Sequence, residues 1–177
     1  MRIISVANQK GGTAKTSTAH ALITGATYKG KKALAIDFDP QGNATSGCGV
    51  DKKKECSAYD LIMGENPYEC IVKTEFEMLD VIPSNISLAG AELELVEAEK
   101  RQYRLRNALD MVRADYDYII IDCPPSLNML TINSMTTADS VLVPIQCEYY
   151  ALEGLSQLIH TINLVRERLN PGLDIEG

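Results

Sequence analysis

The eight residues from position 10 to position 17 constrain the fold of this chain more than any other segment. They read KGGTAKTS and follow a short apolar run, Ile3–Ala7, that is typical of a buried strand. Two consecutive glycines let the backbone approach a ligand closely, because glycine adopts a positive φ without steric cost. The lysine and threonine that follow stand where a helix should begin, and its free N–H groups and dipole favour an anion. The segment therefore predicts a phosphate-binding loop made of Lys10, Gly11, Gly12, Thr13, Ala14, Lys15, Thr16 and Ser17.

Within this loop we expect Lys15 to neutralise the charge on the β- and γ-phosphates and the Thr16 hydroxyl to ligate Mg²⁺. The general pattern G-x-x-x-x-G-K-[ST] is nevertheless broken at both glycines, by Gln9 and Ala14. If position 14 needs a positive φ, alanine costs about 1–2 kcal/mol there. We therefore expect nucleotide binding that is retained but weaker than with glycine. For the loop taken alone, a glycine-rich turn without a ligand is the simpler alternative.

Apolar runs alternate with helical patterns along the whole chain. Helices are expected over 16–28, over 88–112 as one long charge-rich helix, and over 152–169, where apolar residues recur at helical spacing up to a breaker cluster at 170–172. Several runs are continuously apolar, as in parallel strands that are covered on both faces. The alternation predicts a doubly wound α/β fold, a single domain over 1–177 with a mainly parallel sheet and helices on both faces. The expected strands are Ile3–Ala7, Ala33–Ile36, Leu79–Ile82, Tyr118–Ile121 and Val141–Ile145.

Unusual polar segments follow four of these strands. Open parallel sheets bind ligands beyond the carboxyl ends of their strands, so we expect the four segments to converge on one crevice. Asp122 ends an apolar strand, where a buried carboxylate would be costly without a cation, and Mg²⁺ is the expected cation. The segments are Asn8–Thr16, Asp37–Asn43, Asp122–Ser126 and Gln146–Tyr150.

Composition excludes several classes of function. The net charge of −7 argues against a chain that coats nucleic acid, although short basic clusters occur at 52–54 and at 100–106. The longest apolar stretches are far too short to span a membrane, and no secretory signal is expected, so a cytoplasmic protein is predicted. The five cysteines show no C-x-x-C spacing, which predicts free thiols rather than a disulfide framework or a zinc site. His20 and His160 are expected to be packing or surface residues.

The second lysine ahead of the glycine pair resembles the deviant Walker A motif of the ParA/Soj chromosome- and plasmid-partitioning ATPases. The segment 37–43 reads DFDPQGN and matches that family's DxDPQGN, and EYYALEGL at 148–155 matches its segment after the fifth strand. Tyr149 and Tyr150 there are equally compatible with a dimer contact or with core packing. Ser84 and the segment 88–92 also resemble the family, without an assigned role. The resemblance extends from residue 3 to residue 177, with the segments in the family's order.

The resemblance implies a function for several residues. Lys10 would reach across an ATP-dependent homodimer to the partner's nucleotide, which makes Lys10, Lys15 and Asp39 the expected catalytic residues. Asp39 would orient the attacking water, while Thr16, Asp37 and Asp122 would surround Mg²⁺, with Asp37 in its water shell. The resemblance further implies ATP and Mg²⁺ as cofactors, a ParB-like centromere-binding partner, non-specific DNA binding, and a location at the nucleoid without membrane attachment.

Relative to the family, the sequence stops early. The remainder would supply the adenine-side wall, outer strands and much of the DNA-binding surface, and its absence would leave an exposed sheet edge. The main alternative is a nucleotide-binding interaction module in which Ala14 and the early end have abolished hydrolysis. A relative of the cell-division-site ATPases that reach the membrane through a C-terminal amphipathic helix is a further alternative, although no such helix occurs here.

Overall fold

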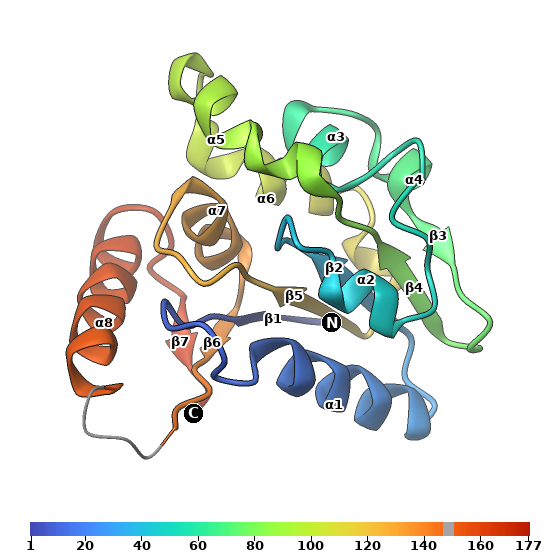
Figure 1. Ribbon diagram of the computed structural model, residues 1–177, viewed down its shortest axis with the longest axis horizontal. Coiled ribbons are helices and arrows are strands. Elements are labelled where there is room, and N and C mark those ends of the chain that lie inside the picture. The colour runs from blue at the N-terminus through green and yellow to red at the C-terminus, as the bar shows by residue number, and fades with distance from the viewer. Residues whose placement is uncertain (147–150) are drawn as a thin grey trace.

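The computed structural model describes residues 1–146 and 151–177, with the backbone alone for residues 151–153. Within these residues, seven strands form one sheet in the order β3-β4-β2-β5-β1-β6-β7 (Figure 1). All neighbouring strands run parallel except β3 and β4, which are antiparallel. The strands are β1 (Arg2–Val6), β2 (Ala33–Asp37), β3 (Val72–Lys73), β4 (Leu79–Ile82), β5 (Tyr118–Asp122), β6 (Ser140–Leu142) and β7 (Asp174–Ile175).

The five predicted strands are all present, and four of them agree with the prediction to within one residue at each end. The fifth is shorter than predicted, because β6 ends at Leu142 and Val143 lies beyond it. The edge strands β3 and β7 were not predicted, since two residues are too few to show an alternating pattern.

Helices cover both faces of the sheet (Figure 1). One face carries α1 (Lys15–Tyr28), which contacts β1, β2 and β5. The opposite face carries α3 (Ala58–Met63), α6 (Arg104–Leu109), α7 (Met129–Thr137) and α8 (Ala151–Arg168). The predicted doubly wound, mainly parallel α/β fold is confirmed.

Alternating side chains of each central strand supply two separate cores. In β2, Leu34 and Ile36 point to the core under α3, α6, α7 and α8, whereas Ala33 and Ala35 point to the core under α1. Strand β5 follows the same alternation, because successive side chains of a strand point to opposite faces. The small alanines allow α1 to lie close to the sheet.

The single long helix predicted over 88–112 is wrong. Leu88, Ala91 and Leu95 are buried at helical spacing, but the next buried position is Leu105, so no apolar stripe holds the intervening residues on the core. Lys100 there adopts a left-handed backbone with φ 50°, which no helix continues through. The segment divides into η1 (Ile86–Ala89), α5 (Ala91–Glu94), η2 (Leu95–Glu97), η3 (Arg101–Tyr103), α6 and η4 (Arg113–Asp115).

The expectation that all cysteines are free thiols is also wrong. Cys56, which precedes α3, forms a disulfide with Cys70 at the end of α4 (Pro67–Cys70), and their Cα atoms are 4.6 Å apart. The turn between α3 and α4 brings the two ends together, and a separation of 14 residues carries no sequence signal for that. Cys48 and Cys123 are buried free thiols. Cys147 lies outside the described residues.

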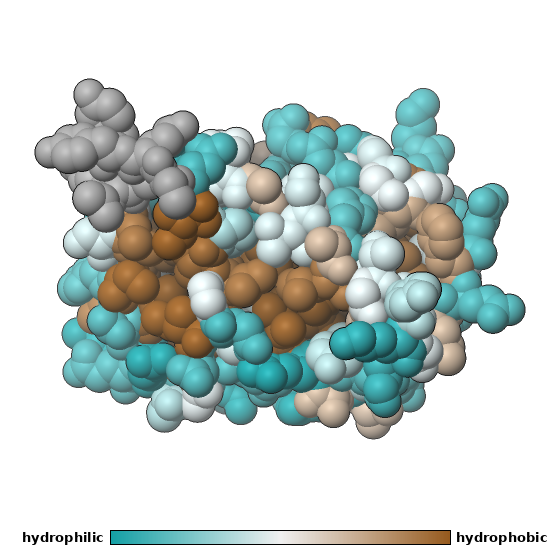
Figure 2. All heavy atoms as spheres, turned by 90° about the horizontal axis from the view of Figure 1, so that it is seen from below, coloured by the Kyte–Doolittle hydropathy of each residue, from teal (hydrophilic) through white to brown (hydrophobic). Residues whose placement is uncertain are grey.

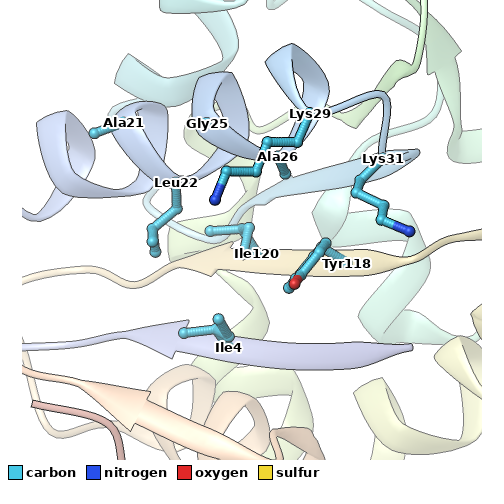
Figure 3. Close-up of a pocket in the computed structure, with 9 residues that line it drawn as sticks. All are labelled: Ile4, Ala21, Leu22, Gly25, Ala26, Lys29, Lys31, Tyr118 and Ile120. Atoms are coloured by element: carbon cyan, nitrogen blue, oxygen red, sulfur yellow. The ribbon is translucent and has the colours of Figure 1, made fainter.

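An apolar groove lies beside α1, on a face with a broad hydrophobic area (Figure 2). Leu22 and Ala26 on α1 face Ile4, Tyr118 and Ile120 on the sheet across a space of about 310 Å³, with the lysines at the end of α1 on its rim (Figure 3). The helix α1 is thus the only cover that the described residues place over this part of the sheet. None of the described helices is long and apolar enough to cross a membrane.

Candidate nucleotide-binding site

Three of the four polar segments predicted to converge do meet beyond the carboxyl ends of β1, β2 and β5. They line an open pocket of about 340 Å³, formed by the loop 11–17 together with Asp39, Gln41, Asn43 and Pro125. Of the fourth segment, the structure describes Gln146, which donates a hydrogen bond from Nε2 to the Gly12 carbonyl at 2.7 Å. The family-like residues Glu148, Tyr149 and Tyr150 lie outside the described residues.

The loop 10–17 folds around the carbonyl of Lys10. This oxygen accepts hydrogen bonds from Lys15 Nζ and Thr13 Oγ1, both at 3.2 Å. The Lys10 N–H in turn donates to Asn8 Oδ1 at 3.0 Å. Helix α1 starts immediately afterwards at Lys15, so the first N–H groups of the helix face the pocket side of the loop.

Ala14 adopts the left-handed conformation, with φ 63° and ψ 28°. The condition under which an alanine is costly at position 14, a positive φ, is therefore met. Gly12 in the same loop has φ 75°, which glycine accepts freely. The alanine therefore stores about 1–2 kcal/mol of backbone strain at the start of α1.

Lys15 is buried beside two carboxylates. Burial lowers the pKa of its ammonium group, and the nearby charges of Asp122 and Asp39 oppose that change. The side chain therefore sits in a low-dielectric environment where its positive charge interacts strongly with any anion in the loop.

Asp122 stands at the tip of β5 and contacts the first turn of α1. Its Oδ2 accepts a hydrogen bond from Thr16 Oγ1 at 2.7 Å, while its Oδ1 is buried without a hydrogen-bond partner among the described residues. Burial raises the pKa of Asp122 to about 7; Asp37 and Asp39 add to the increase, whereas the Thr16 hydrogen bond and Lys15 oppose it. An orphaned buried carboxylate oxygen beside a threonine hydroxyl is the donor set that Mg²⁺ prefers, so the residues present fit this ion.

Asp37 lies next to Asp122 because the two residues are register partners in β2 and β5. Its carboxylate is fully buried and already engaged. Oδ2 accepts from the N–H and the hydroxyl of Thr45, at 2.6 and 2.7 Å, and Oδ1 accepts from the Asp39 N–H at 3.2 Å. Burial raises the pKa of Asp37, and the bonds from Thr45 counteract this. Asp37 therefore holds the chain that follows β2, and its predicted place in the water shell of Mg²⁺ stays a prediction.

Asp39 follows in the turn after β2 and is only partly buried, on the wall of the pocket that holds the loop. Its Oδ1 accepts a hydrogen bond from the Gln41 N–H at 2.9 Å. Of the predicted set, Lys15, Thr16 and Asp39 thus line one pocket, and Asp122 adjoins it through its hydrogen bond with Thr16.

Sequence reasoning missed Thr45. This residue lies in α2 (Asn43–Gly47), and its Oγ1 donates to Asp37 while accepting from the Ser84 N–H at 2.9 Å. The hydroxyl joins the end of β2 to the residue that follows β4. The only available signal was its position eight residues after Asp37, which gives no indication of a contact.

A strand, a phosphate-binding loop at a helix N-terminus and an acidic tip on a neighbouring strand define the P-loop class of nucleotide-binding α/β proteins. Within that class, residues 1–175 match the family model described as an AAA domain. The chain belongs to the Soj/ParA family: it is 54% identical to the sporulation initiation inhibitor protein Soj of Bacillus subtilis, over 99% of this chain and 70% of that protein. It is also 51% identical to the chromosome partitioning protein ParA of Caulobacter vibrioides, over 100% of this chain and 68% of that protein.

Solved structures agree with this assignment. A cobyrinic acid a,c-diamide synthase from Mycobacterium smegmatis with bound ADP and magnesium superposes with a TM-score of 0.95 and 42% identity, over 99% of this chain and 72% of that one. A putative plasmid partition protein from Borrelia burgdorferi bound to AMPPNP gives a TM-score of 0.83 and 30% identity, over 98% of this chain and 73% of that one.

Proposed function

We propose that this chain binds ATP with Mg²⁺, hydrolyses it slowly, and serves as a partitioning ATPase for chromosomal or plasmid DNA. The observation that carries the proposal is the buried Asp122 Oδ1, which lacks a hydrogen-bond partner among the described residues and lies beside the Thr16 hydroxyl and near Lys15. The Mycobacterium and Borrelia structures, with bound ADP and magnesium or AMPPNP, support the same ligands.

The chain's own residues would divide the work as follows. Lys10, Gly11, Gly12, Thr13, Ala14, Lys15, Thr16 and Ser17 hold the phosphates through backbone N–H groups and the Lys15 charge. Thr16 and Asp122 hold Mg²⁺, with Asp37 behind them, and the ion neutralises charge on the phosphate oxygens. Asp39 orients the attacking water. Phosphoryl transfer needs mainly positioning and charge neutralisation, which these groups provide.

The finer parts of the proposal come from the family. Lys10 would complete the nucleotide site of a second copy in an ATP-dependent homodimer. A ParB-like partner would stimulate turnover, and the dimer would associate with nucleoid DNA in the cytoplasm. The net charge of −7 restricts any DNA contact to local basic clusters, so the DNA affinity of this chain should depend steeply on salt.

ATP binding tests the proposal first. Lys15→Ala should weaken binding of MgATP by roughly a hundredfold, since a buried charge-assisted contact to phosphate is lost. Asp122→Asn should reduce the dependence of ATP affinity on Mg²⁺ concentration, while keeping the shape of the side chain. Lys29→Ala, at the far end of the same helix, is the matched control and should leave the affinity unchanged. Calorimetric titration with and without Mg²⁺ measures all three. Wild-type protein that binds no MgATP would refute the proposed function.

Hydrolysis separates the ATPase from a nucleotide-binding interaction module, the alternative that the strained Ala14 favours. Phosphate release should be slow, should increase with DNA and a ParB-like partner, and should be abolished by Asp39→Ala with ATP binding intact. Binding without any release under all these conditions would favour the module.

Dimerisation is tested by a separate measurement. Light scattering should give twice the monomer mass with MgATP and the monomer mass with ADP, and Lys10→Ala should prevent the increase. A monomer in both nucleotides would contradict the proposed role of Lys10.

A further inference from the structure

The short helix α2 is positioned by its contacts rather than by its own stability. Its five residues, Asn43–Gly47, are too few to form a stable helix alone. The chain leads into it directly from Asp39, whose carbonyl accepts from the Gly42 N–H at 2.9 Å; the Gly42 carbonyl then accepts from the Ser46 N–H at 3.2 Å. Any displacement of α2 is therefore transmitted to the turn that carries Asp39.

At its N-terminal half α2 is held by Thr45, and at its C-terminal end it rests on α1 through His20. The imidazole of His20 lies so close to Gly47 that a β-carbon at position 47 would overlap the ring. His20 Nδ1 is 3.9 Å from Cys48 Sγ, and Nε2 is buried without a hydrogen-bond partner among the described residues. The ring therefore packs directly against position 47, and an alanine there would force the ring or α2 to move.

The same side of α1 carries the phosphate-site threonine. Thr16 and His20 are four residues apart, so they lie one above the other on one face of the helix. Thr16 bonds to Asp122 at the tip of β5, and His20 supports α2 one turn further along. One face of α1 thus contacts both Asp122, through Thr16, and α2, the helix that follows Asp39, through His20.

We propose that His20 is a positioning residue, which fixes α2 on α1 through Gly47 and thereby holds Asp39 in place beside Lys15 and Thr16. The proposal rests on the proposed function, because it assigns a role in ATP hydrolysis. The His20 ring acts through its packing against Gly47 in α2.

A double-mutant cycle between positions 20 and 47 tests this. Gly47→Ala should lower kcat about tenfold with KM for ATP changed less than about twofold, because Asp39 is displaced while the phosphate loop is not. His20→Ala alone should also lower kcat several-fold, because α2 loses its support, and adding Gly47→Ala to it should lower kcat little further, since the smaller side chain makes room for the new methyl group. Gly25→Ala is the matched control: it adds the same methyl group to α1, has no atom within 4 Å of the new carbon, and should leave kcat unchanged.

Hydrogen exchange supplies a readout that does not depend on activity. In His20→Ala the amides of 43–48 should exchange about tenfold faster, with the amides of α1 near Gly25 unchanged. Unchanged exchange or unchanged kcat in His20→Ala, or a Gly47→Ala loss of kcat that is equally large in the His20→Ala background, would overturn the proposal. If wild-type protein shows no ATP hydrolysis, the proposed function fails, while the exchange experiment still decides whether His20 fixes α2.

Discussion

The two faces of the sheet are covered very differently. The face under α3, α6, α7 and α8 is filled by large side chains such as Leu34, Ile36 and Phe38, all fully buried. The face under α1 has alanines at the equivalent positions of β2 and leaves an apolar groove open beside the helix (Figures 2 and 3). The first face holds the larger of the two clusters of buried apolar side chains. The second carries the helix that begins the phosphate site, so function depends on the less covered side.

The largest expected difference concerns stability. Leu105→Ala, on the fully covered face, should lower the free energy of unfolding by about 2–5 kcal/mol, because it leaves a cavity in a closed core. Leu22→Ala, in the groove, should lower it by only about 1 kcal/mol, since the leucine is half-exposed. Urea unfolding followed by circular dichroism measures both. Equal losses of unfolding free energy in the two variants would show that the two faces contribute equally to stability.

A smaller effect is expected at the start of α1. Ala14→Gly removes the strain of the left-handed alanine and should strengthen ATP binding by up to roughly tenfold. Gly12→Ala is the mirror control, because it places an alanine at φ 75° in the same loop and should weaken binding by a similar factor. An Ala14→Gly variant with wild-type affinity for ATP would show that the strain at position 14 does not weaken binding.

The groove itself should bind an apolar dye. Anilinonaphthalene sulfonate fluorescence should increase several-fold with the wild-type protein, and Ala26→Glu should remove most of that increase, because a carboxylate cannot be buried in the groove without cost. Ala114→Glu, on an exposed turn, is the control and should leave the fluorescence unchanged. Equal dye binding by both variants would locate the apolar surface elsewhere.

The smallest expected effect is a dependence of the free energy of unfolding on pH, caused by His20 on α1. Burial lowers the pKa of His20 from its ordinary value of 6.5. Below that pH the unfolded chain binds a proton that the folded chain does not, so acidification should reduce the free energy of unfolding. His20→Val should flatten the profile between pH 7 and pH 5 relative to wild type in parallel thermal melts. The change is small because His20 is only partly buried, and parallel profiles would exclude a contribution from His20.

Much of the fold and the site could be predicted from the sequence. The apolar runs located β1, β2 and β5 because strands covered on both faces leave an uninterrupted pattern, and β4 was located although Asp80 interrupts its run. The convergence followed from position: the loop that carries Lys15 and Thr16 follows β1, Asp39 follows β2 and Asp122 ends β5, so these residues meet at one edge of the parallel sheet.

The failures have a common cause in long-range contacts. Helix propensity predicted one helix over 88–112, but only burial decides where such a segment stays helical, and the exposed stretch around Lys100 has none. The Cys56–Cys70 disulfide and the fit of His20 against Gly47 each join residues whose spacing carries no periodic signal. Local patterns contain no information about such pairs.

The Thr45 hydroxyl has a consequence for how this chain tolerates change. One oxygen atom gives its hydrogen to Asp37 and offers a lone pair to the amide of Ser84, so two loops share a single polar link. Valine has the same outline and could occupy the space, yet it would leave the buried Ser84 amide without its partner and remove one of the two hydrogen bonds that Asp37 Oδ2 accepts from residue 45. Serine could serve both groups, although it lacks the methyl group. What matters at this position is therefore the capacity to donate and accept at once, and a substitution that preserves volume would be more harmful than one that preserves the oxygen.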